Sequence, residues 1–317
     1  MNSIAAIVVT YNRKALLEEC LNGLLNSNKK CDIVVVDNAS TDGTQQFVEE
    51  KIKNDDCGDK IFYYNTGKNI GGAGGFNFGI KKAYQLGYEY FWLMDDDTIV
   101  QNDSLEELLK CDEILNGNYG FLSSRANWTD GTRCLMNYHT LDSDWEDDTG
   151  LLLKGLLRLK TATFVSFFVK RNIIEDVGLP IKEYFIWGDD TEFSQRISKK
   201  YNCYYCFNSV VVHKMKDNQS SKEFSQITDL NRIRRMKISI RNDMRTAKFS
   251  GTKSVLKMLL HIFKQIVKCL KSAVSTKVLK SEFCYPVCLQ GYFSPQNRNI
   301  LSNCFFGALF SSAPFIK

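Results

Sequence analysis

The sequence predicts an α/β domain built on a mostly parallel sheet flanked by helices, followed by a basic helical region. Short apolar runs such as IAAIVVT and DIVVVD alternate with helical patterns through the first third of the chain. These runs are apolar at consecutive positions, which is typical of strands that are buried on both faces of a parallel sheet. The chain has 317 residues, 44% of them hydrophobic, which is enough to bury such a core.

The expected strands and helices alternate along the chain. Strands are expected at residues 4–10, 32–38, 60–65 and 90–96, and helices at residues 14–26, 40–50, 74–87 and 104–115. A polar stretch at residues 127–160 then interrupts the pattern. It is followed by β-like runs at residues 161–170 and 203–214, with the segment WGDDTEF between them. The alternation of strand and helix favours βαβ units over an antiparallel sandwich.

Four polar motifs follow predicted strands immediately. They are TYNR at residues 10–13, DNASTDGT at 37–44, NTGKNIGGAGGF at 65–76 and DDD at 95–97. Ligands of parallel α/β sheets bind beyond the carboxyl ends of the strands, so we expect all four motifs to converge on one rim. The second motif has a simpler interpretation, because Ser, Thr and Asp ahead of an apolar helix also serve as a helix N-cap.

The glycine-rich motif permits a tight turn and a close backbone approach to a phosphate. It matches neither of two common phosphate-binding patterns. Counted from Gly72, the sixth position of a dinucleotide-binding Gly-x-Gly-x-x-Gly is Asn77. The Gly-Lys-Ser/Thr ending of a phosphate loop is also missing, because Gly67 and Lys68 are followed by Asn69. Dinucleotide-binding and P-loop enzymes are therefore disfavoured.

The three consecutive carboxylates Asp95, Asp96 and Asp97 predict a metal site. At a buried strand end they would raise one another's pKa unless a cation neutralised them, and oxygen ligands suit Mg²⁺ or Mn²⁺. His213 ends the apolar run SVVVH, so it is delivered to a strand end in the same way. A lone histidine is more often structural, but this placement makes His213 the predicted third ligand.

The segment WGDDTEF offers a second group of carboxylates. A carboxylate within reach of a hydroxyl group can act as a general base. Asp189 and Asp190 also stand at a predicted helix start, where negative charge is favourable, so helix capping is the competing interpretation. Trp187 would line a binding site or simply fill the core.

In this order, the motifs VVTYNR, VVVDNASTDGT, NIGGAGGF, WLMDDD and IWGDDTEFSQR followed by VVVH resemble the family-2 glycosyltransferases of the GT-A fold. Their galactofuranosyltransferase-like branch is the most similar, with the rhamnosyltransferases as close neighbours. The resemblance covers about residues 4–214. It implies that Asp95, Asp97 and His213 bind the metal and that Asp190 is the general base. It also implies a nucleotide-sugar site formed by Thr10, Tyr11, Arg13, Asp37, Asn38, Asn69, Gly71, Gly72, Asp96 and Trp187.

The resemblance implies an inverting, metal-dependent sugar transferase. The expected donor is UDP-galactofuranose, and the expected acceptor is a lipid-linked or cell-surface glycan in polysaccharide synthesis. Rhamnosyl transfer from dTDP-rhamnose is the alternative, and a nucleotidyltransferase or an inactive nucleotide-sugar-binding protein is disfavoured. The chain is shorter than the polymerising members of that branch, so one or a few additions are expected rather than a polymer.

The region after residue 220 is strongly basic. Residues 232–280 hold fourteen of the 41 Lys and Arg residues but a single one of the 36 acids. In residues 251–272, basic side chains (Lys253, Lys257, His261, Lys264, Lys268, Lys271) recur at helical spacing opposite apolar ones (Val255, Leu259, Ile262, Phe263, Ile266, Leu270). Such a helix is typical of binding to an anionic membrane surface, although its apolar face could instead pack on the catalytic domain.

We therefore divide the chain into a catalytic domain at residues 1–220 and a basic, mainly helical, membrane-associating region at 221–317. The N-terminus lacks the basic residues of a signal peptide, and no window approaches the roughly 18 apolar residues of a spanning helix. The expected location is the cytoplasmic face of the plasma membrane. Nucleic acid is not an expected partner, because the basic region contains no recognisable nucleic-acid-binding module.

Overall fold

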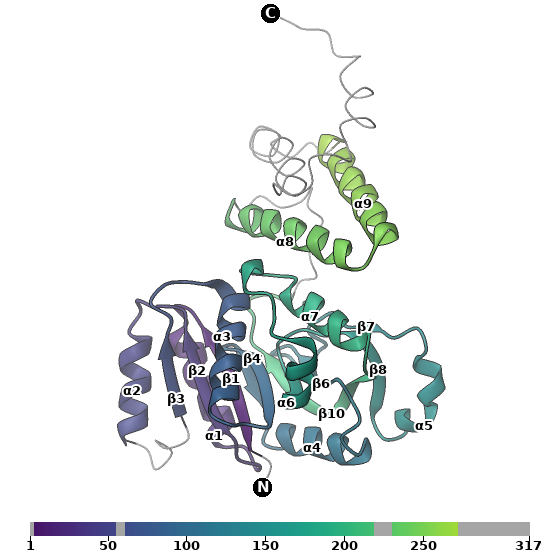
Figure 1. The fold of residues 1–317 in the computed structure, drawn as a ribbon. Coiled ribbons are helices and arrows are strands. Elements are labelled where there is room, and N and C mark those ends of the chain that lie inside the picture. The colour runs from purple at the N-terminus through teal and green to yellow at the C-terminus, as the bar shows by residue number, and fades with distance from the viewer. Residues whose placement is uncertain (1–2, 55–60, 219–229, 272–317) are drawn as a thin grey trace, which may run out of the picture. The chain divides into compact units, whose positions relative to one another are not determined.

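The computed structural model describes residues 3–54, 61–218 and 230–271 (Figure 1). The chain divides into two compact units, Met1–Lys222 and Glu223–Lys317. The first unit contains a single large sheet covered by helices on both faces, so the predicted α/β class is confirmed.

Ten strands of the described residues form this sheet, in the order β3-β2-β1-β4-β9-β6-β10-β8-β7, with β5 paired to β10. Their bounds are β1 (Ile4–Thr10), β2 (Asp32–Asp37), β3 (Ile61–Asn65), β4 (Tyr90–Asp95), β5 (Thr98–Val100), β6 (Phe121–Asn127), β7 (Thr140–Leu141), β8 (Leu156–Thr161), β9 (Phe167–Lys170) and β10 (Cys203–His213).

The strands from β1 to β4 are parallel to one another, and β6 is parallel to β10. Strand β9 lies between β4 and β6 and is antiparallel to both, so β4, β6 and β10 run in the same direction. Strands β5 and β8 pair antiparallel with β10. The carboxyl ends of β1, β2, β4 and β10 therefore point to one edge of the sheet.

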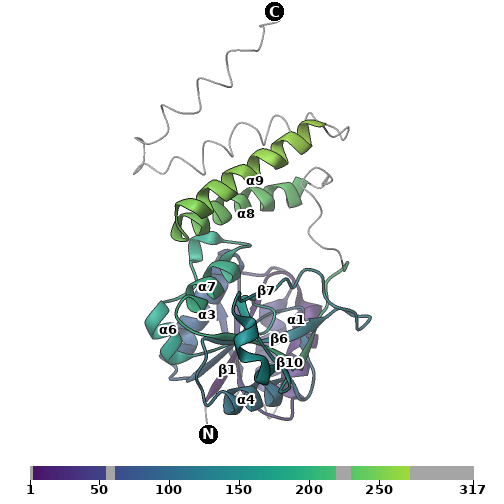
Figure 2. The same ribbon diagram turned by 90° about the vertical axis from the view of Figure 1, so that its right-hand side faces the viewer.

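Helices cover both faces of the sheet because β1 is apolar on both sides. Ile4, Ala6 and Val8 face one side of the sheet, where they pack in a core with residues of α1, α2 and α4. Ala5 and Ile7 face the other side, where they pack in a core with residues of α3, α6 and α7. Figure 2 shows α1 and α3 on opposite sides of the sheet. The helices and 3₁₀ turns of this unit are α1 (Lys14–Leu25), α2 (Thr44–Asn54), α3 (Gly71–Gln85), α4 (Ser104–Ile114), η2 (Trp145–Asp148), α5 (Thr149–Leu152), α6 (Arg171–Val177), η3 (Lys182–Tyr184) and α7 (Asp189–Ser198).

Strands β5, β6, β7 and β8 were not predicted, and the expected strand at residues 161–170 is in fact the end of β8 followed by β9. Polar side chains inside the sheet explain the omission of β6. Ser124 in β6 is buried, and its hydroxyl lies 2.6 Å from that of Ser209 and 2.7 Å from that of Ser166. Trp92 in β4 donates its indole N–H to Ser166 over 2.8 Å. Since these hydroxyls satisfy one another, β6 is central without being an apolar run.

The second unit contains two described helices, α8 (Leu230–Phe249) and α9 (Thr252–Lys271). The helix expected at residues 251–272 is α9. Of the apolar side predicted for it, Val255, Leu259 and Ile262 are half-buried, whereas Phe263 is exposed. Among the described residues, no helix is both long enough and apolar enough to cross a bilayer. Residues 221–229 and 272–317 of the predicted basic region lie outside the described residues.

Candidate active site

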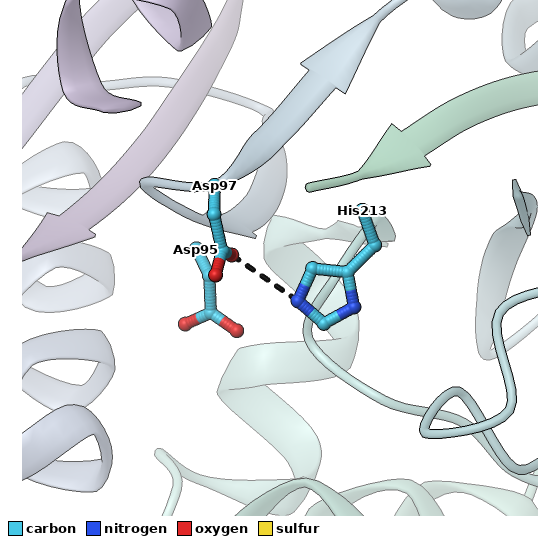
Figure 3. A group of neighbouring side chains, drawn as sticks. All are labelled: Asp95, Asp97 and His213. Atoms are coloured by element: carbon cyan, nitrogen blue, oxygen red, sulfur yellow. Dashed lines mark ion pairs between the residues drawn. The ribbon is translucent and has the colours of Figure 1, made fainter. Parts of the chain in front are cut away.

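Asp97 and His213 are brought together by the pairing of β5 with β10. The chain leaves β4 at Asp95, turns through Asp96 and Asp97, and returns as β5, which pairs Thr98 with His213. The backbone N–H of Lys214 donates to the carbonyl of Asp97 over 2.8 Å. As a result, Nε2 of His213 lies 3.1 Å from Oδ1 of Asp97 (Figure 3).

Asp95, Asp97 and His213 form a cluster that could hold a divalent cation. Each offers one ligand atom, and the three atoms lie within 4.8 Å of one another. Asp97 and His213 are buried, and apart from His213 no described residue donates a hydrogen bond to Oδ1 of Asp97. Two carboxylate oxygens and one imidazole nitrogen suit Mn²⁺ or Mg²⁺, so the residues present fit such an ion.

The other nitrogen of His213 is held by the polar stretch that interrupts the sequence pattern. Nδ1 lies 2.8 Å from Oδ1 of Asn137 and 3.6 Å from Sγ of Cys134. A proton on Nδ1 that is donated to Asn137 leaves the lone pair on Nε2, which faces the aspartates, for a cation. Sequence reasoning missed Asn137 and Cys134, because neither follows a strand and no spacing links them to His213.

The electrostatics of the cluster follow from burial and from the close packing of like charges. Burial, followed by the charge of Asp97, raises the pKa of Asp95 to about 7, and burial raises that of Asp96 to about 6. Burial alone would lower the pKa of His213, but its hydrogen bonds with Asp97 and Cys134 and the charges of Asp97 and Asp95 together outweigh burial and raise it to about 10. Burial would likewise raise the pKa of Asp97, yet His213 and Arg13 hold it below its usual value.

Arg13 contacts the aspartates directly. Its Nη1 lies 3.1 Å from Oδ1 of Asp96 and 2.7 Å from Oδ2 of Asp97. Thr10 donates its hydroxyl to the other oxygen of Asp96 over 2.8 Å. Both residues were predicted to bind the donor. Here they hold two of the three aspartates, which explains how the buried carboxylates are tolerated in this state of the protein.

The other residues predicted for the nucleoside differ in exposure. Asp37 is fully buried, and its carboxylate accepts hydrogen bonds from the Tyr63 hydroxyl over 2.6 Å and the Ser40 amide over 2.8 Å. Asn38 is also buried and donates from Nδ2 to the carbonyl of Gly71 over 3.1 Å. Tyr11 is 43% exposed at the same strand ends. Strand ends β1, β2 and β4 therefore meet at one rim, as expected from the sequence.

The end of the glycine-rich motif forms the start of α3, which begins at Gly71 and not at residue 74 as expected from the sequence. Gly71 has a φ of +75°, and its N–H donates to Oδ1 of Asn69 over 2.8 Å. A Cβ at Gly75 would lie 2.5 Å from a methyl group of Val9, whereas one at Gly72 would meet nothing within 4 Å. Gly75 is thus required for packing on β1, and Gly72 leaves open space at the start of α3.

The carboxylates of WGDDTEF begin helix α7. Oδ1 of Asp190 accepts from the Thr191 amide over 2.6 Å and from the Thr191 hydroxyl over 3.3 Å. Burial raises the pKa of Asp190 despite these hydrogen bonds. Burial and the charge of Asp190 raise the pKa of Asp189 well above its usual value, and the charge of Asp95 adds to this. Asp189 therefore lies within the electrostatic reach of the aspartate cluster.

The first 125 residues match a known family. The model for glycosyl transferase family 2 matches residues 5–125, which include β1 to β5 and the three aspartates. Residues 5–125 therefore carry the sequence pattern of glycosyl transferase family 2. His213 and Asp190 lie beyond the matched segment.

Two relatives of this chain carry the names of sugar transferases. Galactofuranosyltransferase GlfT1 of Mycolicibacterium smegmatis is 27% identical over 208 residues, which cover 61% of this chain and 65% of the relative's length. A glucosyltransferase of Campylobacter jejuni, named for the acceptor GalNAc(5)-diNAcBac-PP-undecaprenol, is 24% identical over 298 residues, or 88% of this chain and 90% of its own length.

Comparison with solved structures identifies the fold. GalNAc-T7, solved with UDP, GalNAc and Mn²⁺, superposes with a TM-score of 0.58 at 14% identity, covering 78% of this chain and 47% of that chain. The fold is therefore GT-A, as the sequence motifs imply.

We predict that the affinity of the protein for Mn²⁺ rises with pH. In the metal-free protein His213 keeps its proton up to a pKa of about 10. An ion bound at Nε2 must displace that proton, so affinity should rise by roughly tenfold per pH unit between about pH 6.5 and 8. Electron paramagnetic resonance of free Mn²⁺ measures this directly. The His213→Asn variant should bind weakly with a shallower pH dependence, and a pH-independent affinity of the wild-type protein would contradict the assignment.

Proposed function

We propose that this protein is an inverting glycosyltransferase that moves one sugar from a nucleotide-sugar donor to a glycan acceptor with the help of Mn²⁺ or Mg²⁺. The observation that carries the proposal is the cluster of Asp95, Asp97 and His213 at the rim where α3 and α7 also begin. A bound ion would supply positive charge to the diphosphate of the donor and stabilise it as a leaving group.

The residues of this chain supply binding and proton transfer. The N–H groups of a first helical turn lack intrahelical partners, and in α3 those of Gly71 and Ala73 already donate to Asn69 and Phe185. Gly72, which has open space beside it, therefore supports diphosphate binding. Tyr11 is exposed at the end of β1, where it can contact the nucleoside. In the transfer, the acceptor hydroxyl gives its proton to Asp190, its oxygen bonds to the anomeric carbon, and the bond to the diphosphate breaks with inversion.

Asp190 is the stronger candidate for the base of the two adjacent aspartates. Oδ1 of Asp190 is engaged by Thr191, and no described residue donates a hydrogen bond to its Oδ2, which leaves that oxygen able to accept a proton. Its raised pKa brings it closer to the working pH of a general base. Asp189 is more deeply buried. Burial, followed by the charges of Asp190 and Asp95, raises its pKa well above the usual value, which favours its neutral form.

The proposed donor is UDP-galactofuranose, on the basis of the similarity to GlfT1 and of the sequence motifs. The undecaprenol-linked acceptor in the name of the C. jejuni relative supports a lipid-linked glycan as the acceptor class. Rhamnosyl transfer from dTDP-rhamnose is the second candidate.

A donor panel tests the function. UDP-galactofuranose, UDP-galactopyranose, dTDP-rhamnose and UDP-glucose are each incubated with the protein, Mn²⁺ and a synthetic lipid-linked acceptor, and products are identified by mass spectrometry. We expect transfer of one or a few galactofuranosyl residues and release of UDP. Transfer from dTDP-rhamnose alone would select the second candidate. Release of pyrophosphate from a nucleoside triphosphate and a sugar phosphate, without glycosyl transfer, would overturn the proposal.

We predict that Asp190→Asn retains UDP binding but loses transfer. The variant keeps the size and much of the hydrogen bonding of the side chain while removing the proton acceptor, so kcat should fall on the order of 100-fold. Asp189→Asn is the matched control. It should lower kcat by a smaller factor, because Asn resembles the neutral form of Asp189. Turnover is measured with the donor that the protein uses in the donor panel, and UDP affinity is measured by calorimetry. A collapse in Asp189→Asn with near-normal turnover in Asp190→Asn would reverse the assignment.

We further propose that α9 binds the anionic surface of the membrane that carries the acceptor. Leu256, Leu260 and Phe263 are 59%, 54% and 56% exposed and fall on one face of the helix at spacings of four and three residues. With 3.6 residues per turn, Lys257 and Lys264 lie next to this apolar stripe. An exposed apolar stripe bordered by lysines is typical of helices that lie in a membrane interface.

We predict that replacing Lys253, Lys257 and Lys264 with Glu releases the protein from acidic liposomes. Each lysine near an anionic leaflet contributes about 1 kcal/mol, so reversing three charges should abolish cosedimentation at low salt. The control replaces three exposed lysines of the first unit, Lys29, Lys53 and Lys81, with Glu and changes the net charge equally. Equal binding of wild type and helix variant would show that α9 does not dock on the lipid.

A further inference from the structure

The backbone of Phe185 occupies the space that a side chain at Gly71 would need. A Cβ on Gly71 would lie 2.0 Å from the carbonyl oxygen of Phe185 and 2.6 Å from its carbonyl carbon. The same oxygen accepts a hydrogen bond from the N–H of Ala73 over 3.2 Å. The segment before α7 therefore rests directly on the first turn of α3, in a contact that only glycine allows.

Hydrogen bonds fix Gly71 beside the ends of β1 and β2, where the predicted donor-binding residues lie. Its N–H donates to Asn69, and its carbonyl accepts from Nδ2 of Asn38 over 3.1 Å. The N–H of Asn38 in turn donates to the carbonyl of Thr10 over 3.0 Å. The peptide groups of Gly71 are thus tied to the ends of β1 and β2, so a side chain at this position would displace Phe185 and not Gly71.

The segment that Gly71 supports is unusual in its backbone. Phe185 and Trp187 have φ values of +64° and +61°, and Gly188 has +86°. A positive φ costs a residue other than glycine roughly 1 kcal/mol or more, and such conformations persist only where the surroundings hold them. The next residue, Asp189, begins α7, and the base assigned above, Asp190, follows it.

We propose that Gly71 is a positioning residue that fixes residues 185–188 against α3 and thereby sets the place of Asp190 relative to the donor. This inference rests on the proposed transferase function. It assigns Gly71 a role other than the diphosphate contact expected from the sequence, because both of its peptide groups already have partners within the protein. The contact joins the donor-binding side of the rim to the segment that carries the base.

The test compares Gly71→Ala with Gly87→Ala. Gly87 lies two residues after the end of the same helix with a φ of +90°, and a Cβ there would meet nothing within 4 Å. The control therefore carries the same backbone penalty without the clash. Two readouts are needed: hydrogen exchange of the peptide spanning residues 182–190, and steady-state kinetics with UDP affinity measured in parallel.

In Gly71→Ala we expect faster exchange of that peptide and a fall in kcat of roughly tenfold or more, because displacements near 1 Å are this costly in an active site. UDP affinity and the KM for the donor should change by less than about threefold, since α3 itself stays in place. Gly87→Ala should match the wild type in both readouts. A parallel loss of UDP affinity and kcat, or unchanged exchange in residues 182–190, would overturn the proposal.

If Gly71→Ala does not fold, Ala73→Pro disturbs the same contact without adding bulk at Gly71. Proline replaces the N–H of residue 73 with a ring carbon, which removes the hydrogen bond to Phe185 and presses on its carbonyl oxygen. Residue 73 lies in the first helical turn, where proline removes no intrahelical hydrogen bond. In this variant kcat is again expected to fall while UDP affinity changes little, and a normal kcat would overturn the proposal. The exchange readout needs no substrate. If the wild type transfers no sugar in the donor panel, the proposed function fails, and exchange still decides whether Gly71 holds the segment.

Discussion

The antiparallel pairing of β5 with β10 is the interaction on which the rest of the site depends. Strand β10 lies three places from β4 in the sheet, with β9 and β6 between them. Without the return of the chain at Asp96 and Asp97, the aspartates at the end of β4 and the histidine at the end of β10 would be separated by the width of two strands. The pairing of Thr98 with His213 closes this distance and places Asp97 against the imidazole.

Three carboxylates at one buried turn are unfavourable unless a nearby positive charge compensates them. Arg13 and the protonated His213 supply it in this structure. A divalent ion would need the lone pair on Nε2 of His213. It would therefore replace the proton on that nitrogen and supply the positive charge in its place. The cluster is therefore balanced with or without the ion, which explains how a buried acidic site is compatible with a stable fold before donor and metal bind.

Periodicity and chain order predicted the parallel half of the sheet, because β1 to β4 are continuous apolar runs that need no partner to be recognised. They did not predict β6, in which the hydroxyl of the buried Ser124 is satisfied by Ser166 and Ser209, residues far away in the sequence. The strand-end rule predicted that the three aspartates and His213 lie close together, and the family resemblance selected Asp95 and Asp97, which form a cluster with His213 in the structure. It could not predict Asn137, nor the contact of Phe185 with Gly71, because both depend on how irregular segments pack and not on a local pattern.

The most direct test of this account is anomalous diffraction from crystals grown with Mn²⁺ and UDP, recorded at the manganese absorption edge. The account predicts a single strong peak bonded to carboxylate oxygens of Asp95 and Asp97 and to Nε2 of His213, with the diphosphate on the same ion. A peak elsewhere, or an ion bound by the aspartates while His213 remains hydrogen-bonded to Asp97, would contradict it.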